Sequence, residues 1–186
     1  VGTLWVAFGY AMSFGGAGSS GFYGIDGFFG IDLNKLFLAD VFNTAKTGSG
    51  LDLVFAGFQG TFAIITVALI SGAIADRARF GSWMIFAALW AILAYFPIAG
   101  WVFNFTLDNG KIVDGGWLVK DVGLLDFAGG TAVEVASGAG ALAIALVVGR
   151  RFGFSKGMYV PHNVPLTLIG AGILWFGWFG FNAGSE

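Results

Sequence analysis

One carboxylate lies inside an apolar stretch of this sequence. Glu134 falls about a third of the way into the run from Phe127 to Gly149, where an ionised side chain costs roughly 2.5 to 3.5 kcal/mol in lipid. At a helical period of 3.6 residues, its face carries the small or polar residues Gly130, Thr131, Ser137, Gly138 and Ala141. Such a carboxyl group can carry a proton or attract a cation. We predict that Glu134 lines a substrate pathway; the alternative is a structural carboxylate bonded to a neighbouring helix.

A second carboxylate, Asp126, immediately precedes the same apolar run. It can accept hydrogen bonds from the free backbone amides of Ala128 or Gly129, which is an N-cap role. We predict that Asp126 supports the structure and takes no direct part in chemistry.

Aromatic residues are dense, with 21 Phe and 7 Trp, and most lie near the ends of apolar runs, as expected for interface belts or packing. Phe58 and Phe62 flank Gln59, and Phe181 has small or polar neighbours. An aromatic face attracts a small cation more strongly once water is removed, so these rings are candidates for a cation pathway. Packing is the alternative for each ring.

The sequence contains few residues that could support other kinds of chemistry. There is no cysteine, and the single histidine, His162, is expected in a solvated loop. The net charge of −2 provides no basic surface for nucleic acid. We see no Gly-x-Gly-Asp motif and no Ser/His pair at membrane depth, so we expect neither an enzyme nor a metal or other cofactor.

The elements that position these residues are apolar stretches near the length of about 20 residues that a membrane-spanning helix requires. They are Val1 to Gly18, Leu53 to Ala75, Phe80 to Phe105, Phe127 to Gly149 and Val164 to Gly184. With 57% hydrophobic and 11% charged residues, the chain is too apolar for a water-soluble domain of its size. We predict an all-α, polytopic membrane helix bundle in a lipid bilayer. Residues 1–186 would form a single transmembrane domain that is incomplete, because the first stretch is short and neither end looks natural.

The connections between these stretches alternate in charge. Residues 76–79 and 150–163 are short and basic, and an excess of Lys and Arg in short loops marks the cytoplasmic side. Residues 19–52 and 106–126 are longer and carry several Asp residues, which we expect outside the cell.

Four stretches resemble motifs of the ammonium transporter family (Amt/Mep/Rh), in the family's order. They are Asp126 to Thr131 (Asp-Phe-Ala-Gly-Gly-Thr), Gly177 to Ser185 (Gly-Trp-Phe-Gly-Phe-Asn-Ala-Gly-Ser), Phe58 to Thr66 and Pro161 to Pro165. The similarity runs over nearly the whole chain. It implies an eleven-helix protomer, usually a homotrimer with one pore in each subunit. The five stretches here are similar to its second to sixth helices.

The resemblance also implies roles for individual residues. Phe62 and Phe181 match two stacked phenylalanines that gate the outer pore, and Ser185 matches a hydroxyl of the outer ammonium-recruitment site. Asp126 matches an aspartate that supports that site. Residues beside these positions, which we expect to support the site, are Phe58, Gln59, Phe127 and Asn182.

Two positions depart from the family's usual pattern. Glu134 falls where most members carry the first of two pore histidines, although some members, including fungal ones, are similar in having Glu. Gly100 and Phe103 replace the usual His and recruiting Trp. Phe is the weaker partner for a cation, and Trp101 is the neighbouring candidate to compensate, although its helical direction is about 200° from that of Phe103.

The resemblance implies transport of ammonium or ammonia across the plasma membrane through a gated hydrophobic pore. A cytoplasmic nitrogen-regulatory signalling protein would dock partly on residues 150–163. The alternative is an ammonium sensor, in which a similar domain binds ammonium and signals through an appended soluble module without transport.

Overall fold

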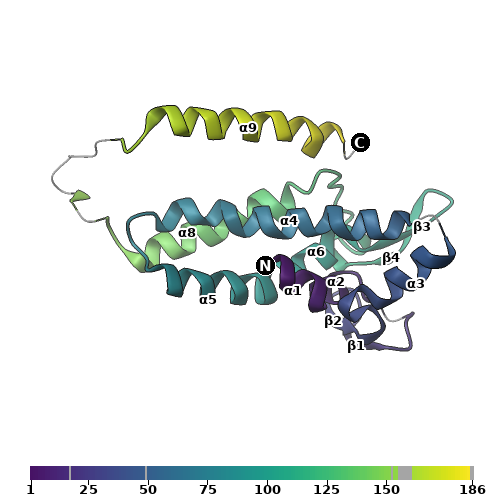
Figure 1. Cartoon of the computed structure of the whole chain (residues 1–186). Helices are drawn as coiled ribbons and strands as arrows, with labels where there is room; N and C mark the ends of the chain where they lie inside the picture. Colours follow the sequence, from purple (N-terminus) through teal and green to yellow (C-terminus); the bar gives the residue numbers. More distant parts are fainter. Residues whose placement is uncertain (17, 49, 152, 155–160, 185–186) are drawn as a thin grey trace.

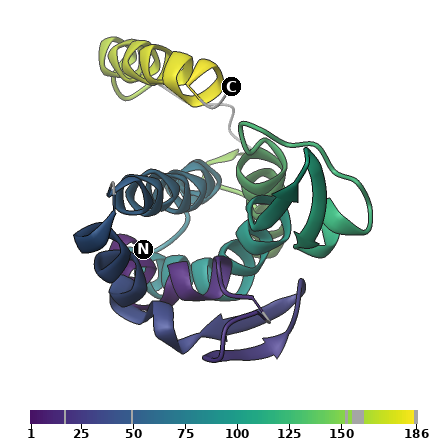
Figure 2. The ribbon, with the colours of Figure 1, turned by 90° about the vertical axis from the view of Figure 1, so that its right-hand side faces the viewer.

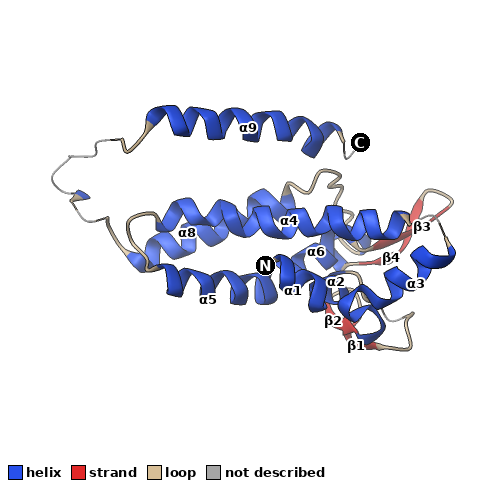
Figure 3. Ribbon diagram, in the orientation of Figure 1, coloured by secondary structure: helices blue, strands red, loops and turns tan. Residues whose placement is uncertain are grey.

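The computed structural model describes residues 1–16, 18–48, 50–151, 153–154 and 161–184, and it is mostly helical (Figures 1 and 3). In this part of the chain, four helices are long and apolar enough to cross a membrane. They are Leu51–Ile74, Phe80–Phe103, Thr131–Val148 and Val164–Ala183. The prediction of a polytopic, helical membrane protein is confirmed, and four of the five predicted stretches have spanning length.

The first predicted stretch, Val1 to Gly18, does not have spanning length as a helix. Its helical part consists of α1 (Gly2–Leu4), a π-helical turn η1 (Trp5–Gly9) and α2 (Tyr10–Ser13). The helix ends there because Phe14 leaves helical geometry and is followed by Gly15 and Gly16, which are poor helix formers.

Two of the four long helices contain a π-helical turn. α4 (Leu51–Ile74) is continuous, whereas α5 (Phe80–Trp90) continues through the π-helical turn η3 (Ala91–Tyr95) into α6 (Phe96–Phe103). The π-helical turn η4 (Thr131–Val135) opens α8 (Ala136–Val148). α9 (Val164–Ala183) begins where the Asn163 side chain accepts a hydrogen bond from the Leu166 amide at 2.9 Å.

The long connections, which the sequence predicts as loops, contain regular structure. In residues 19–52, β1 (Phe22–Ile25) pairs with β2 (Phe29–Asp32), and the 3₁₀ segment η2 (Leu33–Leu38) and α3 (Ala39–Thr47) follow. In residues 106–126, β4 (Lys111–Gly115) and α7 (Trp117–Lys120) follow β3 (Phe105–Asp108), which pairs with β4. The predicted helix to Phe105 is therefore too long by its last residues, because Phe105 already belongs to a hairpin.

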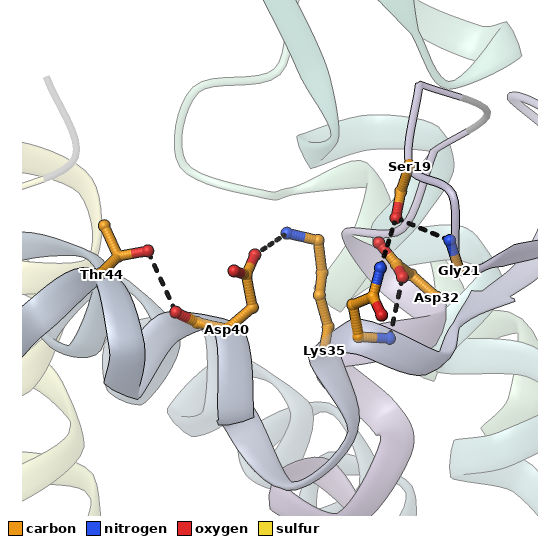
Figure 4. A network of polar contacts seen from close by, with 7 residues as sticks. Ser19, Gly21, Asp32, Lys35, Asp40 and Thr44 are labelled. Atoms are coloured by element: carbon orange, nitrogen blue, oxygen red, sulfur yellow. Dashed lines mark hydrogen bonds and ion pairs between the residues drawn. The ribbon is translucent and has the colours of Figure 1, made fainter.

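Polar contacts hold the first of these connections together (Figure 4). The Asp32 carboxylate accepts a hydrogen bond from the Asn34 amide at 3.0 Å, and Lys35 forms an ion pair with Asp40 at 3.3 Å. The Ser19 hydroxyl accepts hydrogen bonds from the Gly21 amide and the Asn34 side chain, both at 3.2 Å. Part of the acidic charge of this connection is thus neutralised locally.

The core lies where α4 packs against the amino-terminal helical segment (α1 to α2), against the continuous helix formed by η3 and α6, and against η4. The Trp5 indole donates a hydrogen bond to the Ala56 carbonyl at 3.0 Å. Gly60 of α4 permits this approach, because a Cβ there would lie 2.9 Å from the Trp5 ring. α9 lies apart from this bundle along most of its length, as Figures 1 and 2 show, and contacts it through Phe181; the described side chains of α9 include no buried ones.

Candidate functional site

Four phenylalanine rings meet between α4, α6 and α9, and we call Phe58, Phe62, Phe103 and Phe181 the phenylalanine cluster. Phe62 is central: its ring centroid is 4.7 Å from that of Phe58, 4.9 Å from that of Phe181 and 6.2 Å from that of Phe103. Phe62 is only 4% exposed, although Phe58 is 39% exposed. The structure thus brings together two residues predicted as a gate, Phe62 and Phe181, with Phe103 beside them.

The cluster borders a cavity of about 290 Å³ between α4 and α9, lined mainly by apolar and small residues. Phe62 and Phe181 both face it, as do Gly177 and Gly180. α9 approaches α4 here through Phe181, whose ring also stacks on Trp178 at 5.0 Å. An apolar surface of this kind binds no water strongly and offers aromatic faces to a small cation.

Asp126 fixes the start of the helix that carries Glu134. Its Oδ1 accepts hydrogen bonds from the amides of Gly129 at 2.8 Å and Gly130 at 3.0 Å, and its Oδ2 accepts one from Thr131 at 2.7 Å. The sequence predicts such a bond from Ala128 or Gly129, and the bond from Gly129 is present. The helix begins at Thr131 instead of Phe127, because the chain first curls around this carboxylate.

The curl around Asp126 also supports the phenylalanine cluster. Gly129 has a φ of +90°, and a Cβ built on it would lie 2.7 Å from Cζ of Phe103. Glycine is required both for this backbone conformation and for the close approach of the ring. Asp126 therefore acts on the cluster through Gly129 and Phe103, in line with a supporting role.

Glu134 lies in the π-helical turn η4, five residues beyond Gly129. The Val135 amide donates a hydrogen bond to the Gly130 carbonyl at 3.0 Å, which closes a wide turn of five residues. A period of 3.6 residues predicts that Ser137 and Gly138 share the face of Glu134. The wide turn shifts this face, so that Ser137 is buried whereas Gly138 is exposed.

The Glu134 carboxylate lacks polar partners among the described residues. Both of its oxygens are shielded from solvent, and neither has a hydrogen-bond partner on another residue within the described part of the chain. A Cβ on Gly130 would lie 3.9 Å from Oε2, so the side chain lies along the small residue one turn back. A shielded carboxyl group without a bond is costly unless it holds a proton or a cation, or meets donors from another part of the protein.

Trp101 lies away from the phenylalanine cluster. Its ring stacks on Phe28 at 5.4 Å and meets Trp117 edge-on at 5.7 Å, and its indole nitrogen donates a hydrogen bond to the Phe28 carbonyl. The β1–β2 hairpin and α7 thus hold Trp101, and the structure does not bring it next to Phe103. The helical direction read from the sequence is consistent with this separation.

The remaining predicted residues are placed as follows. Gln59 is buried, and its side-chain carbonyl has no hydrogen-bond partner among the described residues. Phe127 is 71% exposed and Asn182 is exposed, so neither joins the cluster. Ser185 lies outside the described residues.

Two buried polar residues that the sequence did not indicate as a pair lie close to one another. Tyr95, in η3, is fully buried, and its hydroxyl lies beside Thr66 of α4. Thr66 is also fully buried and donates a hydrogen bond to the Phe62 carbonyl at 2.6 Å. Thr66 ends a motif that sequence analysis identified, but nothing in the sequence indicates that Tyr95 faces it across the bundle.

No cluster of three or more His, Cys, Asp or Glu side chains that could hold a metal ion occurs among the described residues. The candidate site therefore consists of the phenylalanine cluster, its support at Asp126 and Gly129, and the Glu134 carboxylate further into the same helix.

Comparison with known proteins gives consistent matches. The model of the Ammonium Transporter Family matches residues 1–186. The ammonium transporter of Mycobacterium tuberculosis (strain H37Rv) is 54% identical over 132 residues, which is 71% of this chain and 27% of that protein. Ammonium transporter Amt1 of Archaeoglobus fulgidus is 43% identical over 182 residues, which is 98% of this chain and 40% of that protein.

Solved structures give the same result for the fold. Candida albicans Mep2 has a TM-score of 0.74 at 37% identity and is matched over 98% of this chain and 37% of its own. Saccharomyces cerevisiae Mep2 has a TM-score of 0.72 at 36% identity, over 99% and 38%. The chain thus spans less than half the length of each of these relatives.

Proposed function

This chain belongs to the ammonium transporter family, and from that premise we propose that the whole protein moves ammonium or ammonia across the plasma membrane. The described helices contribute one part of a gated hydrophobic pore. The observation that supports this most is the carboxylate of Glu134, which is shielded and has no hydrogen-bond partner on another described residue; it lies in an apolar helix whose start packs against Phe103 of the phenylalanine cluster.

The first step is recruitment of ammonium at the outer end. Ser185 and the aromatic faces near it bind the cation. Phe103 stands where the family usually has a Trp, which is a stronger partner for a cation. The acidic residues of 19–52 and 106–126 raise the local cation concentration modestly, an effect that salt screens.

The second step is passage through the phenylalanine cluster. Phe62 and Phe181 have ring centroids only 4.9 Å apart, so a substrate passes only when a ring rotates or the two helices separate. Phe58 and Phe103 pack on Phe62 and limit that rotation. An apolar constriction penalises hydrated ions, because these would have to lose water without replacement.

The third step involves Glu134. Its carboxylate binds the ammonium ion or receives a proton from it, and the small residue Gly130 leaves room beside it. Helices from the part of the protein beyond this chain complete the pore wall and supply further polar groups, because a pathway at membrane depth must be sealed by protein.

We further propose that residues 1–186 are one incomplete transmembrane domain, and that the whole protein forms a homotrimer. Large apolar side chains of α5, α8 and α9 are exposed in the described chain and require lipid, the rest of the protomer or a neighbouring subunit to cover them. The basic connections 76–79 and 150–163 face the cytoplasm, where a nitrogen-regulatory signalling protein docks, and the hairpins face outward.

Uptake of labelled methylammonium tests this function. The full-length protein is produced in cells that lack their own ammonium transporters, with Phe62→Trp as the variant that blocks the cluster. We expect saturable uptake that unlabelled ammonium inhibits, and loss of uptake in the variant at equal membrane abundance. Specific binding of ammonium without uptake would instead identify a sensor and contradict the proposal.

A further inference from the structure

Three arginines surround a cavity at the end of the bundle opposite the hairpins. Arg77 lies in the connection between α4 and α5, and Arg150 and Arg151 follow α8. These two segments lie at the same end of the bundle in Figure 1. The cavity has a volume of about 460 Å³, and Leu146 and Phe154 complete much of its wall. None of these residues belongs to the candidate pathway.

Contacts with the end of α8 hold Arg77 in place. Its Nη1 donates a hydrogen bond to the Gly149 carbonyl at 2.6 Å, a favourable position for a cation because helix C-termini carry partial negative charge. Its Nε is shielded from solvent and has no hydrogen-bond partner within the described residues. A shielded N–H group of a guanidinium without an acceptor is available to donate to one from outside the described chain.

The positive charge of the cavity is not neutralised by described carboxylates. The ion pairs found in the described residues, Lys35–Asp40 and Lys120–Asp114, both lie in the connections at the other end. Asp76 is next to Arg77 in the sequence but does not line the cavity. Arg150 lies over the Phe154 ring at 5.5 Å, a cation–π contact that orients its guanidinium.

We propose that this arginine cavity, defined by Arg77, Arg150 and Arg151, binds a phosphate group. Guanidinium groups match phosphate oxygens in charge and in paired hydrogen-bond geometry. The phosphate is carried by an anionic phospholipid or by a free phosphate ion. The cavity lining favours the lipid, because Leu146 and Phe154 provide an apolar wall for an acyl chain beside the arginines. This binding is independent of ammonium and of the proposed transport.

Native mass spectrometry of the purified full-length protein tests the proposal with phosphatidylglycerol and phosphatidylcholine of equal chain length. The parent is expected to bind phosphatidylglycerol more tightly. Each arginine near an anionic lipid surface contributes about fivefold in affinity, so Arg150→Gln/Arg151→Gln should weaken phosphatidylglycerol binding about 25-fold and leave phosphatidylcholine binding unchanged. Arg79→Gln is the matched control, because Arg79 is exposed in the same connection as Arg77 and does not line the cavity.

Two further arms identify the source of the phosphate and the role of Arg77. Inorganic phosphate at millimolar concentration is added as a competitor: no displacement supports the lipid headgroup, and displacement supports free phosphate at the same site. Arg77→Gln should weaken binding about fivefold, with thermal melting measured alongside to detect misfolding. Equal phosphatidylglycerol binding by the parent and Arg150→Gln/Arg151→Gln, or an equal loss in Arg79→Gln, would overturn the proposal.

Discussion

Replacing Asp126 by Asn tests how the start of the helix that carries Glu134 supports the phenylalanine cluster. The carboxylate accepts three backbone hydrogen bonds, two through Oδ1 and one through Oδ2. Asn keeps the shape of the side chain but has only one acceptor oxygen, so its NH₂ group must face at least one amide donor. The Asp126→Asn variant therefore loses at least one charge-assisted bond, whereas Asp126→Ala loses all three.

The magnitude follows from these bonds. A hydrogen bond to a charged group contributes about 1.5 to 3 kcal/mol, and Asp126 is half-buried, so water replaces part of each lost bond. We expect the free energy of unfolding to fall by about 1 to 2 kcal/mol in Asp126→Asn and by about 3 to 4 kcal/mol in Asp126→Ala. Because Gly129 contacts Phe103, transport should fall with stability.

The assay combines thermal melting of the full-length protein in detergent with methylammonium uptake. Asp108→Asn is the control, since Asp108 is an exposed aspartate of the β3–β4 hairpin. Melting and uptake equal to the parent in Asp126→Asn would refute the reasoning, and so would equal losses in the Asn and Ala variants.

Other predictions concern the neighbours of this site and the β3–β4 hairpin. Phe62→Ala removes ring contacts with three other phenylalanines and should cost about 3 to 5 kcal/mol of stability, measured by melting against Phe62→Leu. Gly129→Ala should cost about 1 to 3 kcal/mol, because its φ is +90° and its Cβ would meet the Phe103 ring; unchanged melting would contradict this. The hydrogen bond from Lys120 lowers the pKa of Asp114, and the same bond raises the pKa of Lys120. The ion pair should thus protect the amides of the β3–β4 hairpin from hydrogen exchange. This protection should be lost when the pH falls through the lowered pKa of Asp114 or rises through the raised pKa of Lys120. Asp114→Asn or 1 M salt should also remove it.

Much of the helical arrangement could be predicted because membrane helices follow a simple physical rule. Stretches such as Leu53 to Ala75 must hide their backbone in lipid, and about 20 apolar residues do so as a helix. The observed helix, Leu51–Ile74, differs by only a residue or two at its ends. The bonding role of Asp126 was equally predictable, since a carboxylate before a helix meets unpaired amides.

The hairpins were harder to predict from the sequence, although one sequence signal was present. Asn109 and Gly110 both have positive φ, as a two-residue hairpin turn requires, and Asn-Gly is the usual sequence for that turn. The polar composition of residues 106–126 obscured this signal. The register of η4 had no signal, because a π-helical turn depends on packing against α4 and leaves no fixed pattern in the sequence.

For the site, sequence spacing predicted which residues share a helix better than which residues meet between helices. Phe62 and Phe181 are more than a hundred residues apart, and their pairing came from the family resemblance. Tyr95 and Thr66 meet across the bundle without any matching sequence feature. Trp101 shows the opposite case, since its helical direction already separated it from Phe103.

The most direct test of the central claim is the ammonium-evoked current of the full-length protein in proteoliposomes, measured beside Glu134→Gln at equal protein density. The account predicts a current in the parent that falls or changes its ion selectivity in Glu134→Gln, because this carboxylate lies in the pathway. Equal currents in the two proteins would contradict the account and leave Glu134 a structural role.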